Sequence, residues 1–156
     1  MSASDGGDTT SQKGLLAKVI CIMSCIPGDV IAILARVILG LVFWLSAQTK
    51  IEGFALKAST FFLFENEYKV PLIPPDVAAY MATAAELICP LLLWAGLATR
   101  FGATALLCMT LVIQIFVYPN AYVTHGLWAI GLLFLIKYGP GRLSLDHLIR
   151  SRYMGS

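Results

Sequence analysis

The sequence predicts an all-α membrane protein built as a bundle of four transmembrane helices. Hydrophobic residues make up 58% of the chain of 156 residues and charged residues only 13%, whereas about a quarter of the residues in a soluble domain are charged. The mean hydropathy is +0.80. Long apolar runs alternate with segments that contain Pro, Gly or polar residues. A chain of this composition cannot cover its own surface with polar groups, so we expect the lipid bilayer to surround it.

Charge and motif content exclude several other classes of protein. The 11 basic and 9 acidic residues give a net charge of +2, which is too small for a nucleic-acid-binding surface. We find no Gly-rich phosphate loop, no HExxH or CxxCH motif and no CxxC pair. We therefore expect no nucleic-acid partner, no intrinsic cofactor and no stand-alone enzyme activity.

Two segments precede the first long apolar run. Residues 1–13 are rich in Ser, Thr and Gly and are expected to form a flexible tail. Residues 14–28 are apolar but too short to span a bilayer, and Pro27 and Gly28 end them, so we expect an interfacial helix. Cys21 and Cys25 lie one turn apart on it and are weak candidates for a soft metal such as Cu(I). The alternative, that both are small apolar residues, is favoured because no His flanks them, and we predict no metal site.

The transmembrane domain is expected over residues 29–141. A crossing helix needs about 20 predominantly apolar residues. Pro74, Pro119 and the triplet that begins at Gly139 mark boundaries between the apolar runs. The last two runs are short, but their aromatic ends are typical of interfacial belts. The four expected helices are residues 30–47, 77–98, 101–118 and 122–138.

The distribution of Lys and Arg predicts the orientation, because cytoplasmic loops carry the excess of basic residues. Seven basic residues fall on the side of the termini and three on the other side. Both termini are therefore expected in the cytoplasm, with residues 142–156 as a cytoplasmic tail. Residues 53–68, between the first two spans, are expected to form a short amphipathic helix on the outer face. The basic residues are Lys13, Lys18, Arg100, Lys137, Arg142, Arg150 and Arg152 on one side, and Lys50, Lys57 and Lys69 on the other.

Three ionisable side chains interrupt the expected spans: Arg36, Glu86 and His125. Each costs about 2.5 to 3.5 kcal/mol in a transmembrane helix, which invites a functional hypothesis. Glu86 lies near mid-span on a face of small residues that lets another helix approach closely. Pro90 cannot donate a hydrogen bond to the carbonyl of Glu86, so one turn offers both a carboxyl and a free acceptor.

The sequence predicts an outward-opening polar cleft with Glu86 at its floor and Lys50, Gln114 and His125 as its walls. Glu86 and His125 are candidates for passing protons, and Arg36, Lys50 and Gln114 for binding. Each residue also has a purely structural alternative. Arg36 could serve only to lock two helices together by pairing with Glu86, and Gln114 could be an interhelical hydrogen-bonding group. His125 could anchor at the membrane interface, and Lys50 could snorkel to it. The spacing leaves open whether Arg36 or Lys50 pairs with Glu86.

Four stretches of the chain resemble the DoxX family: residues 36–50, 70–103, 109–129 and 139–148. The resemblance covers most of the chain from about Ala35 onward and leaves out the first 30 residues. It implies a four-helix protein of the bacterial inner membrane. Some members of the family are membrane subunits of thiosulfate:quinone oxidoreductase, and relatives occur with oxidative-stress and metal-handling proteins.

The resemblance implies a membrane subunit of a quinone-linked redox complex, whose cleft receives quinone or passes protons and whose partners are other membrane or redox subunits. The alternative is a non-catalytic accessory subunit of a larger respiratory or photosynthetic assembly. Small-solute or metal handling is a third hypothesis, disfavoured because the chain shows no internal repeat. On the first hypothesis, Glu86 is needed for function and not for folding.

Overall fold

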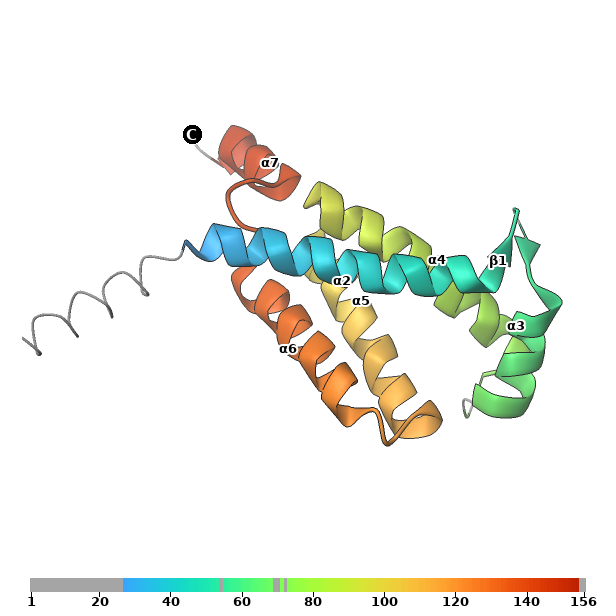
Figure 1. Cartoon of the computed structure of the whole chain (residues 1–156). Helices are drawn as coiled ribbons and strands as arrows, with labels where there is room; N and C mark the ends of the chain where they lie inside the picture. The colour runs from blue at the N-terminus through green and yellow to red at the C-terminus, as the bar shows by residue number, and fades with distance from the viewer. Residues whose placement is uncertain (1–26, 54, 69–70, 72, 155–156) are drawn as a thin grey trace, which may run out of the picture.

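The computed structural model describes residues 27–53, 55–68, 71 and 73–154. The expected tail and nearly all of the expected interfacial helix, including Cys21 and Cys25, lie outside the described residues. The described part is all-α except for one two-stranded hairpin, and four long helices dominate it (Figure 1). They are α2 (Gly28–Lys50), α4 (Pro75–Ala95), α5 (Thr99–Val112) and α6 (Tyr122–Tyr138).

Three helical segments are long and apolar enough to cross a membrane, which confirms an all-α protein with several candidate spans. They are Gly28–Lys50, Pro75–Ala95 and Thr99–Val117, the last of which joins α5 to the π-helical turn η2 (Ile113–Val117). The fourth, α6, is apolar but has only 17 residues. At 1.5 Å per residue, α6 is about 26 Å long.

Local sequence determines where these helices begin and end. Pro75 occupies the first turn of α4, where its missing N–H costs nothing. Gly96 ends α4 with a φ of 66°, a left-handed conformation that glycine adopts without strain. The carboxylate of Asp146 accepts hydrogen bonds from the N–H groups of Ala98 and Thr99, at 2.8 and 3.1 Å, and so caps the start of α5.

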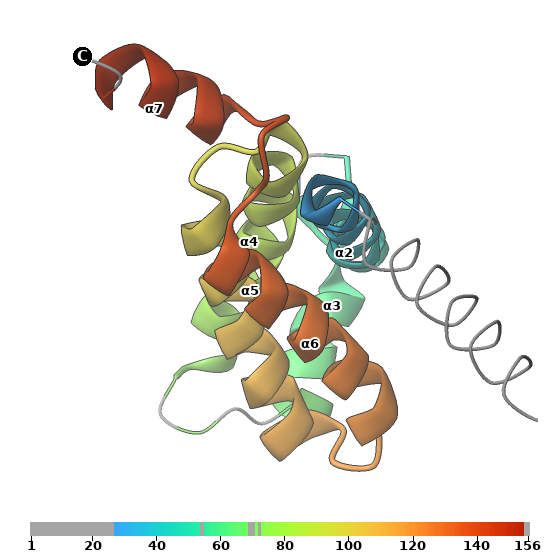
Figure 2. The same cartoon turned by 90° about the vertical axis from the view of Figure 1, so that its left-hand side faces the viewer.

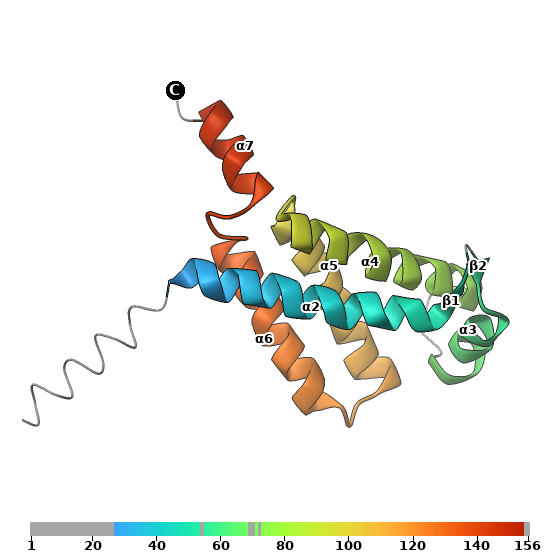
Figure 3. The ribbon, with the colours of Figure 1, turned by 45° about the horizontal axis from the view of Figure 1, so that its top comes forward.

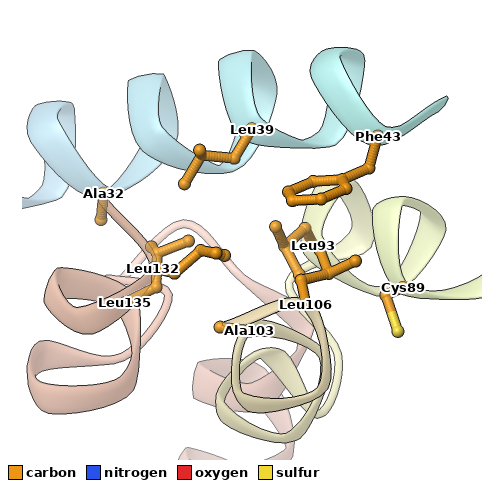
Figure 4. Close-up of a cluster of buried hydrophobic side chains, with 9 residues drawn as sticks. All are labelled: Ala32, Leu39, Phe43, Cys89, Leu93, Ala103, Leu106, Leu132 and Leu135. Carbon is orange, nitrogen blue, oxygen red and sulfur yellow. The ribbon is translucent and has the colours of Figure 1, made fainter. Parts of the chain in front are cut away.

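The four long helices pack as neighbours: α2 contacts α4 and α6, and α5 contacts α4 and α6. Their shared core is a cluster of apolar side chains in which Phe43, Leu93, Leu106 and Leu132 are almost completely buried (Figure 4). The outward faces are apolar too, and on α2 Leu45 is 61% exposed. Apolar residues on both faces are what a helix between a protein core and lipid requires.

The segment between the first two long helices is more complex than the single amphipathic helix we expected for residues 53–68. It forms a hairpin of β1 (Ile51–Glu52) and β2 (Ala55–Leu56), then α3 (Ala58–Leu63) and the π-helical turn η1 (Phe64–Tyr68). Gly53, with a φ of 62°, lies in the turn of the hairpin. Phe64 packs against Ala78 and Ala79, which fixes this segment to the start of α4.

The segment expected only as a cytoplasmic tail, residues 142–156, contains a further helix, α7 (Leu145–Met154). Figure 3 shows α7 projecting from the end of the bundle where α2 begins, while α3 and the hairpin lie at the opposite end; Figure 2 views the bundle from the end where α2 begins. We call these the α7 end and the α3 end.

Candidate functional site

A cavity of about 230 Å³ lies inside the α3 end of the bundle. Residues of α2, α4, α5, α6 and the two π-helical turns line it, so all four long helices contribute to one space. Most of its walls are apolar, and its polar groups come from a few side chains. The lining residues are Val42, Phe43, Ser46, Lys50, Phe64, Tyr68, Ala82, Glu86, Met109, Val112, Ile113, Val117, Tyr118, His125 and Trp128.

An ion pair between Lys50 and Glu86 forms one polar wall of this cavity. The Lys50 Nζ lies 2.5 Å from Glu86 Oε2, and the side chains are 10% and 3% exposed. Ser46, one turn before Lys50 on α2, donates a hydrogen bond to Glu86 Oε1 at 3.0 Å and accepts one from Lys50 Nζ at 2.9 Å. The carboxylate is therefore held by two groups of the same helix face. The structure thus pairs Glu86 with Lys50 and not with Arg36, and Lys50 does not snorkel.

His125 of α6 is a further polar group in the wall of this cavity, and its ring is hydrogen-bonded to Gln114. The Gln114 Nε2 donates a hydrogen bond to the carbonyl of Pro119 at 2.7 Å. Its Oε1 is thereby left to accept, and it lies 2.7 Å from Nδ1 of His125. The neutral imidazole then carries its proton on Nδ1, which leaves Nε2 as an acceptor. His125 is 6% exposed, so it is a buried wall of the cavity and not an interfacial anchor.

The position of Gln114 depends on the π-helical turn η2 at the end of α5. A π-helical turn inserts an extra residue into the helical ladder and is frequent at functional sites. Gln114 falls within η2, and Tyr118 follows directly after it. Tyr118 meets Tyr68 of η1 edge to face, with ring centroids 5.9 Å apart. The two π-helical turns therefore bring an aromatic pair to the α3 side of the cavity.

Sequence reasoning missed Ser46 and Tyr68 as members of this site. The only signal for Ser46 was its spacing of four residues before Lys50, which places both on one helix face. Tyr68 follows Glu65 and Glu67 at the end of a segment expected only as an amphipathic helix on the outer face. Burial raises the pKa of Tyr68, so its phenol stays protonated at neutral pH.

Arg36 lies away from the cavity, at the α7 end of the bundle. Its guanidinium donates four hydrogen bonds to backbone carbonyls, with donor–acceptor distances between 2.6 and 3.1 Å. Because the last carbonyls of a helix lack intrahelical partners, Arg36 completes the end of α4 and ties the chain after α6 to it. The acceptors are the carbonyls of Leu93, Trp94, Pro140 and Leu143.

Four of the five site residues predicted from the sequence therefore lie at or beside this cavity. Lys50, Glu86 and His125 line it, and Gln114 orients His125. It combines a carboxylate–ammonium pair with an unprotonated imidazole nitrogen inside an otherwise apolar space. Such a set can hydrogen-bond and exchange protons with a small ring-shaped ligand. Among the described residues, no group of three or more His, Cys, Asp or Glu side chains could hold a metal ion.

Comparison with known proteins identifies the family. The sequence matches the DoxX family over residues 31–119, which include Arg36, Lys50, Glu86 and Gln114. It is 32% identical over 146 residues to an uncharacterized protein of Haemophilus influenzae, and the alignment covers 85% of this chain and 92% of that protein. No solved structure matches the chain significantly. With its candidate membrane-spanning helices and this match over more than half of its length, the chain belongs to the DoxX family of membrane proteins.

Proposed function

We propose that this protein is the membrane subunit of a quinone-linked redox complex and that the cavity at the α3 end binds the quinone headgroup. The observation that carries the proposal is the composition of the cavity wall. The Lys50–Glu86 pair and His125 come from different helices and line one apolar space of about 230 Å³. A planar ring with polar oxygen atoms needs apolar walls for its faces and a few hydrogen-bonding groups for its edge.

The size of the cavity agrees with a single substituted ring. An apolar cavity of about 150 Å³ holds one benzene molecule, and this cavity is about 230 Å³. Phe43, Phe64 and Trp128 supply aromatic surface around it. A fused three-ring cofactor would need considerably more room, so a quinone headgroup fits better than a flavin.

The polar residues would position the ring and handle protons. The ammonium group of Lys50 can donate a hydrogen bond to a ring oxygen, and Nε2 of His125 can accept one from a hydroxyl. Quinone reduction takes up two electrons and two protons, and the electrons would come from a partner redox subunit. Glu86 and His125 are then the groups of this chain that hold or pass protons, because a carboxyl and an imidazole are side chains that act as general acids and bases.

The proposal includes a four-helix topology in which α6 also crosses the bacterial inner membrane. Leu132 and Leu135 of α6 are fully buried against the bundle, while Tyr122 and Tyr138 at its ends are 69% and 62% exposed, as expected of an aromatic belt. A span of about 26 Å can be accommodated by local thinning of the bilayer. The backbone N–H of Arg142 donates to Asp29 at 2.8 Å. This contact joins the start of α2 to the chain after α6, which supports placing both on one side, with the basic residues favouring the cytoplasm.

Binding of a short-chain quinone by the purified protein in detergent tests the proposal. Trp128 lines the cavity and lies 5.1 Å from the His125 ring, so quinone in the cavity should quench its fluorescence. We expect saturable quenching in the parent and binding at least about tenfold weaker in His125→Leu, because a buried hydrogen bond to a ligand contributes about 1.5 kcal/mol.

Glu65→Gln is the control, because it removes a carboxylate that is exposed and outside the cavity. Equal quinone affinity in the parent and in His125→Leu, with both proteins folded, would show that this cavity is not the quinone site. It would favour the alternative of a non-catalytic accessory subunit, for which the cavity is incidental.

A further inference from the structure

A second and larger cavity, of about 630 Å³, lies at the α7 end of the bundle. It is formed by the start of α5, the segment that follows α6, and α7, and it shares no lining residue with the first cavity. From the sequence, residues 101–118 are expected only as a span, residues 139–141 only as a helix end and residues 142–156 only as a tail. None of the residues of the proposed quinone site contributes to it.

Three arginines line this cavity: Arg100, Arg142 and Arg150. Its carboxylates are already engaged by backbone groups, since Asp29 accepts from the N–H of Arg142 and Asp146 caps α5. In the described part of the chain, the guanidinium groups of Arg142 and Arg150 have no hydrogen-bond or ion-pair partner. Guanidinium groups bind phosphate oxygens in pairs of parallel hydrogen bonds. The cavity therefore offers unused donors for a phosphate.

Apolar side chains surround the same cavity. Phe101 and Tyr138 line it and are 72% and 62% exposed. On α7, Leu145, Leu148 and Ile149 are 43%, 61% and 47% exposed and share one helix face at spacings of three and four. The other face of α7 carries Asp146, His147 and Arg150, which line the cavity. This division into an apolar and a polar face is typical of helices that lie in the membrane interface.

We propose that this cavity binds the phosphate group of an anionic phospholipid. The arginines would bind the headgroup, and the exposed face of α7 would enter the boundary between headgroups and acyl chains. A basic pocket between the ends of transmembrane helices is the arrangement that recognises anionic headgroups. The exposed apolar residues favour a lipid over a free phosphate ion, because a soluble anion would leave them uncovered.

Native mass spectrometry of the detergent-purified full chain tests this, with phosphatidylglycerol, phosphatidylcholine of the same acyl chains, and inorganic phosphate as separate probes. We expect phosphatidylglycerol to bind most tightly. The Arg142→Gln/Arg150→Gln variant should bind it about tenfold to thirtyfold more weakly, given the contribution of each basic residue near anionic lipid. Arg150→Gln alone should weaken binding about fivefold.

The control Lys57→Gln removes one charge outside the cavity, at the α3 end, and should retain the affinity for phosphatidylglycerol, in contrast to Arg150→Gln. Equal phosphatidylglycerol affinity in the Arg142→Gln/Arg150→Gln variant and the parent, or no preference over phosphatidylcholine in the parent, would overturn the proposal. Inorganic phosphate that displaces phosphatidylglycerol at comparable concentration would assign the arginines to a soluble anion and overturn the lipid assignment. The measurement is independent of quinone binding at the other end.

Discussion

The ion pair between Lys50 and Glu86 makes a sharp prediction about stability. Glu86→Gln should destabilise the protein by about 3 kcal/mol, because removing one partner of a buried pair leaves the other charge uncompensated. We choose the low end of the usual range because the Lys50 side chain is 10% exposed and belongs to the last residue of α2. Lys50→Met should be similarly costly, since it leaves the Glu86 carboxylate, 3% exposed, with only the hydroxyl of Ser46.

The double variant Lys50→Met/Glu86→Gln removes both charges and keeps the side-chain volumes similar. Replacing both members of a buried ion pair is often neutral, so its stability should fall within about 1 kcal/mol of the parent. The single effects add to about 6 kcal/mol, so the coupling energy between the two sites should be about 5 kcal/mol. We would measure it by unfolding in mixed detergent and SDS micelles, followed by the fluorescence of the three tryptophans.

A second pair, Lys57→Met/Glu65→Gln, provides the control. Glu65 is exposed, Lys57 is half-buried, and no ion pair joins them among the described residues, so their effects should add to within about 0.5 kcal/mol. Additive effects at Lys50 and Glu86 as well would refute the buried ion pair. The structure also changes our expectation that Glu86 is dispensable for folding, because Gln at that position leaves Lys50 unpaired.

Two further predictions rest on helix packing, and a third rests on the distribution of basic residues. Ala82→Leu should weaken quinone binding at least tenfold while the fold is retained, because Ala82 lines the cavity and the larger side chain would fill part of it; unchanged quenching of Trp128 would contradict this. Gly40→Val should lower the free energy of unfolding by at least about 2 kcal/mol in the same assay, since a Cβ at Gly40 would overlap the Trp94 ring. Parent-like unfolding of this variant would show that α2 and α4 do not meet at Gly40. In a variant without native cysteines, Lys57→Cys should react with an impermeant thiol reagent in intact cells, and Asp146→Cys should react only after lysis. The reverse pattern would show that the termini face the outside.

The long helices could be predicted from sequence because apolar runs and their Pro and Gly boundaries are local features. The expected span at residues 77–98 corresponds to α4 at Pro75–Ala95, and the glycine that ends α4 was present in the sequence to be read. The hairpin at Ile51–Leu56 could not be predicted, because strands of two residues are too short to show an alternating pattern. The helix α7 was missed because the segment was judged by its charge alone.

The membership of the site was predicted better than its geometry. At 1.5 Å per residue from the ends of the expected spans, Glu86 is expected well below Lys50. In the structure α2 continues to Lys50, and α4 extends past its end, so that Ser46 and Glu86 lie at the same level. The relative shift of two helices depends on packing between them and leaves no local pattern. The role of Arg36 was hidden for a related reason, since its partners are backbone carbonyls, which every residue has.

The two ends of the bundle differ in how closely their helices meet, and this difference explains why the cavity lies where it does. A Cβ at Gly102 or Gly131 would crowd Leu93 or Leu39, so these glycines allow close contact in the middle of the bundle and toward the α7 end. Toward the α3 end, most of the lining residues are large, Ser46 and Ala82 excepted, and Lys50, Glu86 and His125 lie where small side chains would allow helix contact. A buried ion pair is a poor means of holding helices together, because apolar side chains of the same volume would do so at least as well. Its presence at the wall of a cavity is therefore better explained by a ligand with polar atoms than by stability.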